Sequence, residues 1–245
     1  MTETFAALLL AHVLADFVFQ TKSMAQAKAA GGLAALLLHL ALVGGLALVA
    51  LRPTDASGLM AVAGLTLAHG LIDLAKTRAP QDRFWPFAAD QAAHLASLAL
   101  VAATLPGLWT AGWGTGLLPA ATPSLAALGA GAILATRAGG FAIGLFMRPW
   151  ADVALEGLPG GGRIIGHLER GLIFLLVLAG TAEGIGFLIA AKSVLRFGAV
   201  KEESRLSEYV IIGTLASFGW AFAVTLATVA LMSGLPPLGI PDLSP

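Results

Sequence analysis

LAALLLHLALVGGLALVAL (33–51) is an apolar run of nineteen residues in which His39 has the only polar side chain. About 20 mostly apolar residues are enough for a helix to cross the hydrocarbon core of a membrane. The rest of the chain has the same character, because 58% of the 245 residues are hydrophobic and 11% are charged, against roughly 25% charged in soluble domains. The sequence therefore predicts an integral membrane protein.

Six further apolar runs surround this one in the sequence. They cover Thr4–Phe19, Gly58–Ala75, Phe87–Leu105, Leu125–Met147, about Gly171–Ala191, and Tyr209–Met232. All are expected to be helical, because an open sheet cannot satisfy its backbone in lipid and the alternating pattern of a transmembrane barrel is missing. The sequence predicts an all-α, polytopic transmembrane helix bundle with six or seven crossings. We expect one integral membrane domain over residues 1–245, made of a His/Asp four-helix part (1–105), an interfacial loop (106–123) and C-terminal helices with basic loops (124–245).

The number of crossings depends on the run at 169–197, ERGLIFLLVLAGTAEGIGFLIAAKSVLRF. Basic residues follow the first, third and fifth predicted spans, which by the positive-inside rule makes those loops cytoplasmic and the N-terminus periplasmic. Lys192 and Arg196 would break this rule if the run crossed the membrane once. Either the AGTAEG segment turns a re-entrant helical hairpin, or the run is a single tilted helix.

Three short motifs each pair a histidine with an aspartate four residues away: HVLAD (12–16), HGLID (69–73) and the reversed DQAAH (90–94). Residues i and i+4 lie on one face of a helix, about one turn apart. The predicted topology sends the first and third spans inward and the fourth outward. The reversed order therefore places the three aspartates in one layer and the three histidines in a second layer one turn deeper, with His39 at the level of His94.

These matched layers favour a divalent metal site, because ionised aspartates inside a bundle are costly unless they are paired or bound to metal. Its expected ligands are His12, Asp16, His39, His69, Asp73, Asp90 and His94. The chain has no cysteine, and imidazole with carboxylate suits zinc, iron or manganese. Such an ion could serve a hydrolase or transferase that acts on a lipid-linked or phosphorylated substrate. Two alternatives remain open: an ion or proton path through the same residues, and a purely structural or partner-binding role, in which the pairs only hold helices together.

Other polar residues are candidates for supporting roles. Gln20 lies two turns beyond His12 on the same helix face and could orient a metal ligand. Basic and acidic residues near the predicted cytoplasmic interface could bind lipid headgroups or simply follow the positive-inside rule: Arg163, Glu169, Arg170, Lys192 and Arg196. The expected partner is therefore membrane lipid. The net charge is zero and the basic residues are scattered, so nucleic acid is not expected as a partner.

With these residues collected, the sequence resembles an uncharacterised bacterial membrane-protein family, domain-of-unknown-function family 3307. The resemblance is carried by AHVLADFVFQTKSMAQAKA, LLHLAL, AHGLIDLAK, DQAAHLASL, IGHLERGLIF, IGFLIAAKSVLRF and EYVIIGTLASF, which together run along nearly the whole chain. It implies a multi-pass protein of the bacterial inner (cytoplasmic) membrane. It implies no reaction, so the metal hypothesis is based on the layered His/Asp pairs alone.

Overall fold

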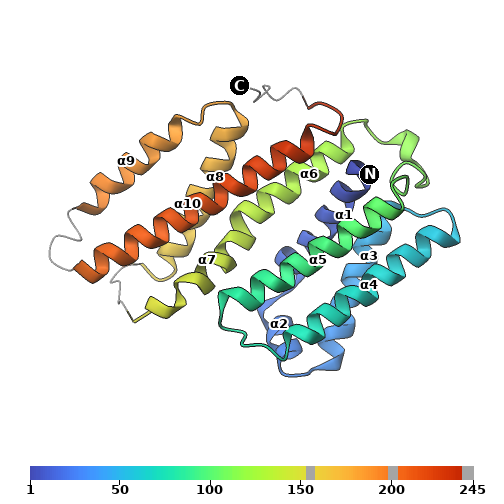
Figure 1. Ribbon diagram of the computed structural model, residues 1–245, viewed down its shortest axis with the longest axis horizontal. Coiled ribbons are helices and arrows are strands. Elements are labelled where there is room, and N and C mark those ends of the chain that lie inside the picture. The colour runs from blue at the N-terminus through green and yellow to red at the C-terminus, as the bar shows by residue number, and fades with distance from the viewer. Residues whose placement is uncertain (153–157, 198–203, 239–245) are drawn as a thin grey trace. The chain divides into compact units, whose positions relative to one another are not determined.

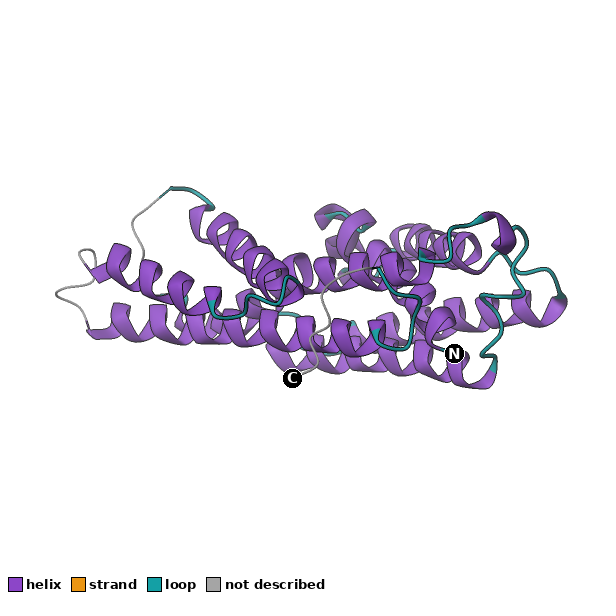
Figure 2. Cartoon of the chain, turned by 90° about the horizontal axis from the view of Figure 1, so that it is seen from above, coloured by secondary structure: helices purple, strands orange, loops and turns teal. Residues whose placement is uncertain are grey.

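The computed structural model describes residues 1–152, 158–197 and 204–238, with the side chains of 194–197 and 204 left out. Helices are the only regular secondary structure in these residues, and no strand occurs among them (Figure 2). The all-α prediction is confirmed. Five helical stretches are long and apolar enough to span a membrane: Thr2–Phe19, Leu33–Leu51, Ala56–Lys76, Thr122–Trp150 and Arg205–Met232. They support a membrane protein, while the total of six or seven crossings stays a prediction.

The N-terminal half contains α1 (Thr2–Leu14), the π-helical turn η1 (Ala15–Phe19), α2 (Lys22–Ala29), α3 (Leu33–Leu51), α4 (Ala56–Lys76) and α5 (Phe84–Thr104). Local chemistry fixes several boundaries. The Thr21 hydroxyl accepts a hydrogen bond from the Met24 amide at the start of α2 (3.2 Å), and an Asp55 carboxylate oxygen accepts one from the Gly58 amide at the start of α4 (2.8 Å). These side chains satisfy amides that have no partner within the helix.

The C-terminal half contains a short 3-10 turn, η2 (Thr115–Leu117), then α6 (Thr122–Ile133), the π-helical turn η3 (Leu134–Ala138), α7 (Gly139–Met147), the 3-10 turn η4 (Arg148–Trp150), α8 (Gly161–Leu178), α9 (Gly184–Phe197) and α10 (Ser204–Met232). The segment 169–197 is two helices joined by a turn, rather than one helix. Gly180 adopts a left-handed conformation there (φ 69°), and Lys192 of α9 reaches back to Glu169 of α8. The hairpin is therefore present, and its re-entry into a membrane stays a prediction.

The described residues divide into two compact units, one formed by residues 1–133 and 230–238 and the other by those within 134–229. In the first unit α1 is the inner helix, packed against α3, α5 and α6, while α4 contacts α3 and α5 (Figure 1). Fully buried alanines, Ala6 in α1 and Ala15 at the start of η1, let the neighbouring helices approach closely, and the larger Leu8 and Val13 are fully buried beside them. In the second unit, Ile173 and Val177 of α8 pack against Phe218 and Ala221 of α10.

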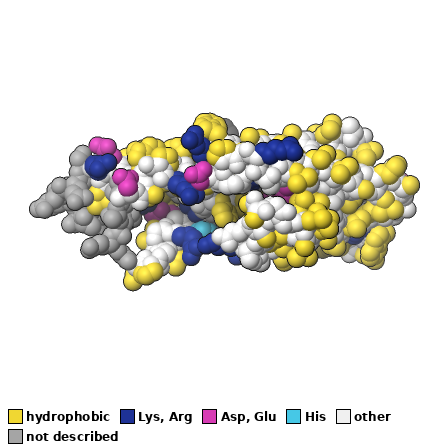
Figure 3. Space-filling model, turned by 90° about the horizontal axis from the view of Figure 1, so that it is seen from below, with side chains coloured by type: hydrophobic (Ala, Val, Ile, Leu, Met, Phe, Trp, Pro, Cys, Tyr) yellow, Lys and Arg dark blue, Asp and Glu magenta, His cyan; other side chains and the backbone are white. Residues whose placement is uncertain are grey.

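The outward faces of the first unit are apolar. Val49 of α3, Leu67 of α4 and Leu100 of α5 are 73%, 64% and 64% exposed, and hydrophobic side chains cover much of the face drawn in Figure 3. Extended exposed apolar surface is unfavourable in water but suits hydrocarbon. The histidines of these helices, together with Asp73 and Asp90, are turned inward instead.

Candidate metal centre

Four of the five histidines are buried together in the first unit, where α1, α3, α4 and α5 meet. His12, His39, His69 and His94 are each at most 4% exposed. Their rings form a continuous series: centroids lie 5.1 Å apart for His39 and His69, 4.0 Å for His69 and His94, and 5.1 Å for His94 and His12. Each of these helices contributes one imidazole. The structure thus brings all four into one cluster, from positions as much as 82 residues apart in the sequence.

Asp16, His39 and His69 form the tightest group of potential ligands. The Nε2 atoms of His39 and His69 are 3.0 Å apart, and Oδ1 of Asp16 lies 3.3 Å from the first and 3.4 Å from the second. Ligands placed 2.0–2.2 Å from a tetrahedral zinc ion are about 3.3–3.6 Å from one another. The three atoms therefore have nearly the spacing of three corners of such a tetrahedron. The fourth corner would be left for another ligand.

Asp73 lies close to the same two imidazoles. Its Oδ2 atom is 3.6 Å from Nε2 of His39 and 3.8 Å from Nε2 of His69, and it also accepts a hydrogen bond from Nζ of Lys28 at 2.5 Å. Lys28 comes from the short helix α2. The lysine neutralises a carboxylate that would otherwise be a fourth ligand, so Lys28 and a cation would compete for Asp73.

The other side of the cluster is built around Asp90 and His94 of α5. Oδ2 of Asp90 pairs with Nζ of Lys76 at 2.6 Å, and Oδ1 lies 3.8 Å from Nδ1 of His94. Gln91 links this side to α1: its amide nitrogen is 3.5 Å from Oδ2 of Asp16, and its oxygen is 3.4 Å from Nε2 of His12. His12, Asp16 and His94 offer ligand atoms that all lie within 4.8 Å of one another, and so do His69, Asp73 and His94.

Several buried polar atoms of the cluster have no hydrogen-bond partner among the described residues. They are both ring nitrogens of His94, Nδ1 of His12, Nδ1 of His39, Oδ1 of Asp16 and Oδ1 of Asp90. Asp16 Oδ1 is near two imidazole nitrogens, but without hydrogen-bond geometry. Since nearly all buried polar groups in proteins are hydrogen-bonded, this concentration of unpaired atoms marks a place suited to a further ligand.

Asp16 is carried by the π-helical turn η1. The Gln20 amide bonds to the carbonyl of Ala15, five residues back, at 2.9 Å, which widens the helix at this turn. Such single π turns are frequent at functional sites. The Gln20 side chain approaches the Asp16 carbonyl at 3.5 Å, so Gln20 supports the backbone of a candidate ligand rather than the ligand's side chain.

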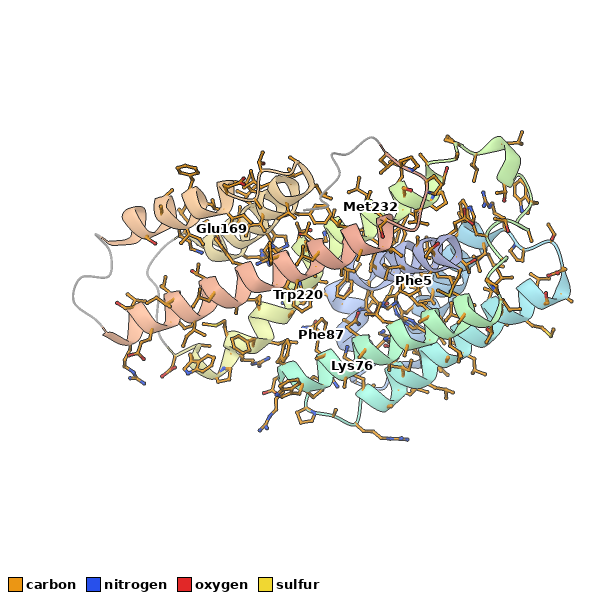
Figure 4. The ribbon with its side chains drawn as sticks, turned by 45° about the horizontal axis from the view of Figure 1, so that its top comes forward. Phe5, Lys76, Phe87, Glu169, Trp220 and Met232 are labelled. Atoms are coloured by element: carbon orange, nitrogen blue, oxygen red, sulfur yellow. The ribbon has the colours of Figure 1, made fainter. Side chains whose placement is uncertain are left out.

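A pocket of about 190 Å³ adjoins the cluster. Its polar lining consists of Gln20, Lys28, Asp73, Lys76, Thr77 and Gln81. Nζ of Lys76 lies 5.6 Å from the centre of the Phe87 ring (both labelled in Figure 4). A molecule bound in this pocket would therefore contact two lysines, Lys28 and Lys76, and one candidate metal ligand, Asp73.

The other predicted polar residues belong to the second unit. Arg163, Glu169, Arg170 and Lys192 line a cavity of that unit. The backbone of Arg196 lies in α9, and its side chain is outside the described part of the structure. No side-chain geometry can therefore be given for Arg196.

Three residues that contact the cluster were not predicted from the sequence: Lys28, Lys76 and Gln91. Lys76 stands three residues after Asp73, yet it pairs with Asp90 of the next helix. Gln91 follows Asp90 directly, which puts it off the face shared by positions 90 and 94. Gln91 could have been noticed as a polar residue inside an apolar helix. Lys28 could have been noticed as a lysine in the short polar segment that follows the first motif.

Comparison with known proteins gives a family and no function. No curated protein and no solved structure matches the chain. A family model described as "Protein of unknown function (DUF3307)" matches residues 4–112. The match includes all three His/Asp motifs and His39, whereas the resembling segments beyond residue 160 lie outside it. Residues 4–112, which carry the whole His/Asp cluster, are therefore similar to the DUF3307 family.

Proposed function

We propose that the His/Asp cluster binds a divalent metal ion, with Asp16, His39 and His69 as its ligands. The observation that carries this proposal is the set of three distances, 3.0, 3.3 and 3.4 Å, between their ligand atoms. Three protein ligands with a fourth position open are typical of catalytic zinc sites. Zinc, iron and manganese all accept this combination of imidazole and carboxylate.

The residues that line the adjoining pocket favour a substrate with a phosphate group. Lys28 and Lys76 line it, and both currently pair with carboxylates of the cluster. A bound cation would compete with Lys28 for Asp73, and a lysine released in this way is available to a phosphate oxygen. The pocket also has apolar walls formed by Leu33, Leu36 and Leu74, which suits a phosphate attached to a lipid.

The corresponding activity is a metal-dependent hydrolase or transferase that acts on a phosphorylated or lipid-linked substrate. When bound, the ion supplies Lewis acidity, which polarises a phosphoryl oxygen or acidifies a water molecule. Oδ2 of Asp73 lies within 3.8 Å of both imidazole nitrogens, so this carboxylate is the one for which the ion and Lys28 would compete. Lys76 and a released Lys28 would hold the phosphate.

A second candidate function is a proton path, and the series of imidazoles favours it. His39, His69, His94 and His12 follow one another at ring separations of 4.0–5.1 Å. A cavity of about 10 Å³ is lined by His12, His69, His94 and Ser97, which is room for about one water molecule. Buried histidines and aspartates in series are a common means of moving protons through membrane proteins.

Elemental analysis of the purified protein tests the first proposal. The protein is made without a polyhistidine tag or chelator, together with Asp16→Asn and His39→Gln. Asp82→Asn is the matched control, because Asp82 is exposed in the loop before α5. We expect about one equivalent of zinc, iron or manganese in the wild type and in Asp82→Asn, and none in the two ligand variants.

The same preparation separates the two candidate functions. Wild-type protein that remains metal-free after zinc, iron or manganese is added would overturn the metal proposal. Reconstitution into vesicles with a pH-sensitive dye then tests the proton path, for which His94→Gln should abolish flux. His167→Gln is the control in that assay, because His167 belongs to the second unit.

A further inference from the structure

The second unit contains a larger cavity, of about 440 Å³, between α7, α8 and α10, with Lys192 of α9 at its wall. Glycines make room for it on all three of those helices. A Cβ atom at Gly166 would lie 3.0 Å from an Arg170 guanidinium nitrogen, and one at Gly140 would lie 3.4 Å from another. The helices thus leave space around one arginine head group.

Arg170 is a buried cation that makes no ion pair with a carboxylate among the residues that the structure describes. It is 3% exposed. Its guanidinium donates to the Ser217 hydroxyl at 3.0 Å and to the Thr136 carbonyl at 3.1 Å, and Nε has no partner among the described residues. Both acceptors are neutral. A buried charge that is compensated only by neutral groups is costly.

The neighbouring acid, Glu169, makes no ion pair with Arg170 among the described residues and is shared with a second cation. Glu169 pairs with Nζ of Lys192 at 2.8 Å (Glu169 is labelled in Figure 4). Among the described residues, the charged side chains that line the cavity are Arg163, Arg170, Lys192 and Glu169. The wall therefore carries three positive charges and one negative charge, which leaves an excess of positive charge beside an open volume.

We propose that this cavity binds a phosphate-bearing anion, with the Arg170 guanidinium as its main contact and Lys192 and Arg163 beside it. A guanidinium offers several donors in a planar fork that matches phosphate oxygens. The remaining wall includes Ile143, Met147, Ile165 and Val210, which can contact an acyl chain. An anionic phospholipid and free phosphate both carry this group, and the experiment distinguishes these two sources.

The test measures binding to the purified full chain in detergent by native mass spectrometry, with phosphatidylglycerol in one arm and inorganic phosphate in the other. Arg170→Gln removes the central charge. Gly144→Leu fills the cavity without changing any charge, and a Cβ atom at Gly144 meets nothing within 4 Å. Arg148→Gln is the matched control, since Arg148 is an exposed arginine of the same unit that does not line the cavity.

We expect one ligand per chain in the wild type and in Arg148→Gln, and at least about tenfold weaker binding in Arg170→Gln and Gly144→Leu, as loss of a charge-assisted phosphate contact implies. Binding of phosphatidylglycerol alone identifies a lipid headgroup, and binding of inorganic phosphate identifies a free anion. If neither probe binds the wild type, or if folded Gly144→Leu binds like the wild type, the proposal is overturned. Asp16→Asn should bind the anion normally, which keeps this result separate from that of the metal site.

Discussion

Nε2 of His39 faces Nε2 of His69 at 3.0 Å, across the contact between α3 and α4. Only one of the two nitrogens can carry the proton that joins them. The same two nitrogens lie 3.3 and 3.4 Å from Oδ1 of Asp16, and 3.6 and 3.8 Å from Oδ2 of Asp73. A cation at this position would replace one shared proton with bonds to both imidazoles. The metal proposal and the proton-path proposal therefore concern the same pair of atoms.

Lys28→Met tests the competition between a lysine and a metal for Asp73. The Lys28 and Asp73 side chains are 11% and 10% exposed, so removal of the lysine leaves a nearly buried carboxylate without its partner. We expect the metal-free variant to lose roughly 3 kcal/mol of stability. Added zinc should raise its melting temperature by more than it raises that of the wild type.

Lys22→Met is the control for this experiment, because Lys22 is an exposed lysine of the same short helix. It should melt like the wild type with and without zinc. Equal zinc-induced shifts in Lys28→Met and in the wild type would show that Lys28 does not compete for the site.

Gln91→Leu tests whether the residue that joins α5 to α1 orients the candidate ligands. Gln91 contacts Asp90 at 3.1 Å, Asp16 at 3.5 Å and His12 at 3.4 Å. Loss of a residue that orients metal ligands typically lowers affinity 10- to 100-fold, so we expect a fall of about that size in zinc titrations. Gln26→Leu, at an exposed position in α2, should leave the affinity unchanged, and an unchanged affinity in Gln91→Leu would contradict the role.

The predicted orientation can be tested with single cysteines, because the natural chain has none. Ser57→Cys lies at the start of α4, and Thr77→Cys directly follows its end. The positive-inside rule places position 57 in the periplasm and position 77 in the cytoplasm. A membrane-impermeant maleimide added to intact cells should label the first variant and not the second, and the reverse pattern would invert the proposed topology.

The cap of α4 predicts a dependence of stability on pH. Asp55 accepts hydrogen bonds from the Gly58 amide and the Ser57 hydroxyl, and the Gly58 bond lowers the pKa of Asp55 below its ordinary value of 3.8. The folded state therefore prefers the ionised form. The stabilisation is complete above pH 3.8 and is lost as the pH falls through the lower pKa of the folded state.

Asp55→Asn provides the comparison, because asparagine also caps helices but does not titrate in this range. The difference in melting temperature between the wild type and this variant should be constant near neutral pH. Below pH 3.8 the melting temperature of the wild type should fall relative to that of the variant. A difference that stays the same across the whole range would show that the carboxylate charge makes no contribution.

The sequence was sufficient to predict those features that follow from composition and helical spacing. Membrane-type helices follow from the long apolar runs, because hydrocarbon requires every backbone group to be bonded within the segment. The positions of α1, α3, α4 and α5 also follow, since polar residues and glycine mark their ends, whereas the short polar helix α2 was not among the expected apolar runs. The reversed order of DQAAH predicted that His94 would lie near the other pairs, and in the structure it does.

Other features depended on contacts between segments far apart in the chain. Nothing in the sequence distinguishes the group of Asp16, His39 and His69 from the other possible triads, because their distances are set by how α1, α3 and α4 pack. The π-helical turn that carries Asp16 and the reach of Lys28 to Asp73 are also results of packing. The sequence of 169–197 allows either a helical hairpin or a single tilted helix. The structure has a turn at 179–183, which brings Lys192 beside Glu169.

The sequence by itself determined that this is a helical membrane protein with buried histidines and aspartates, because the hydrophobic runs and the i,i+4 spacing act within single helices. Only the tertiary structure decided which of those side chains meet, and that Arg170 is buried beside a cavity with neutral partners. The physical reason is that ligand geometry and charge compensation depend on distances of a few ångströms between helices, and the packing of whole side chains sets those distances.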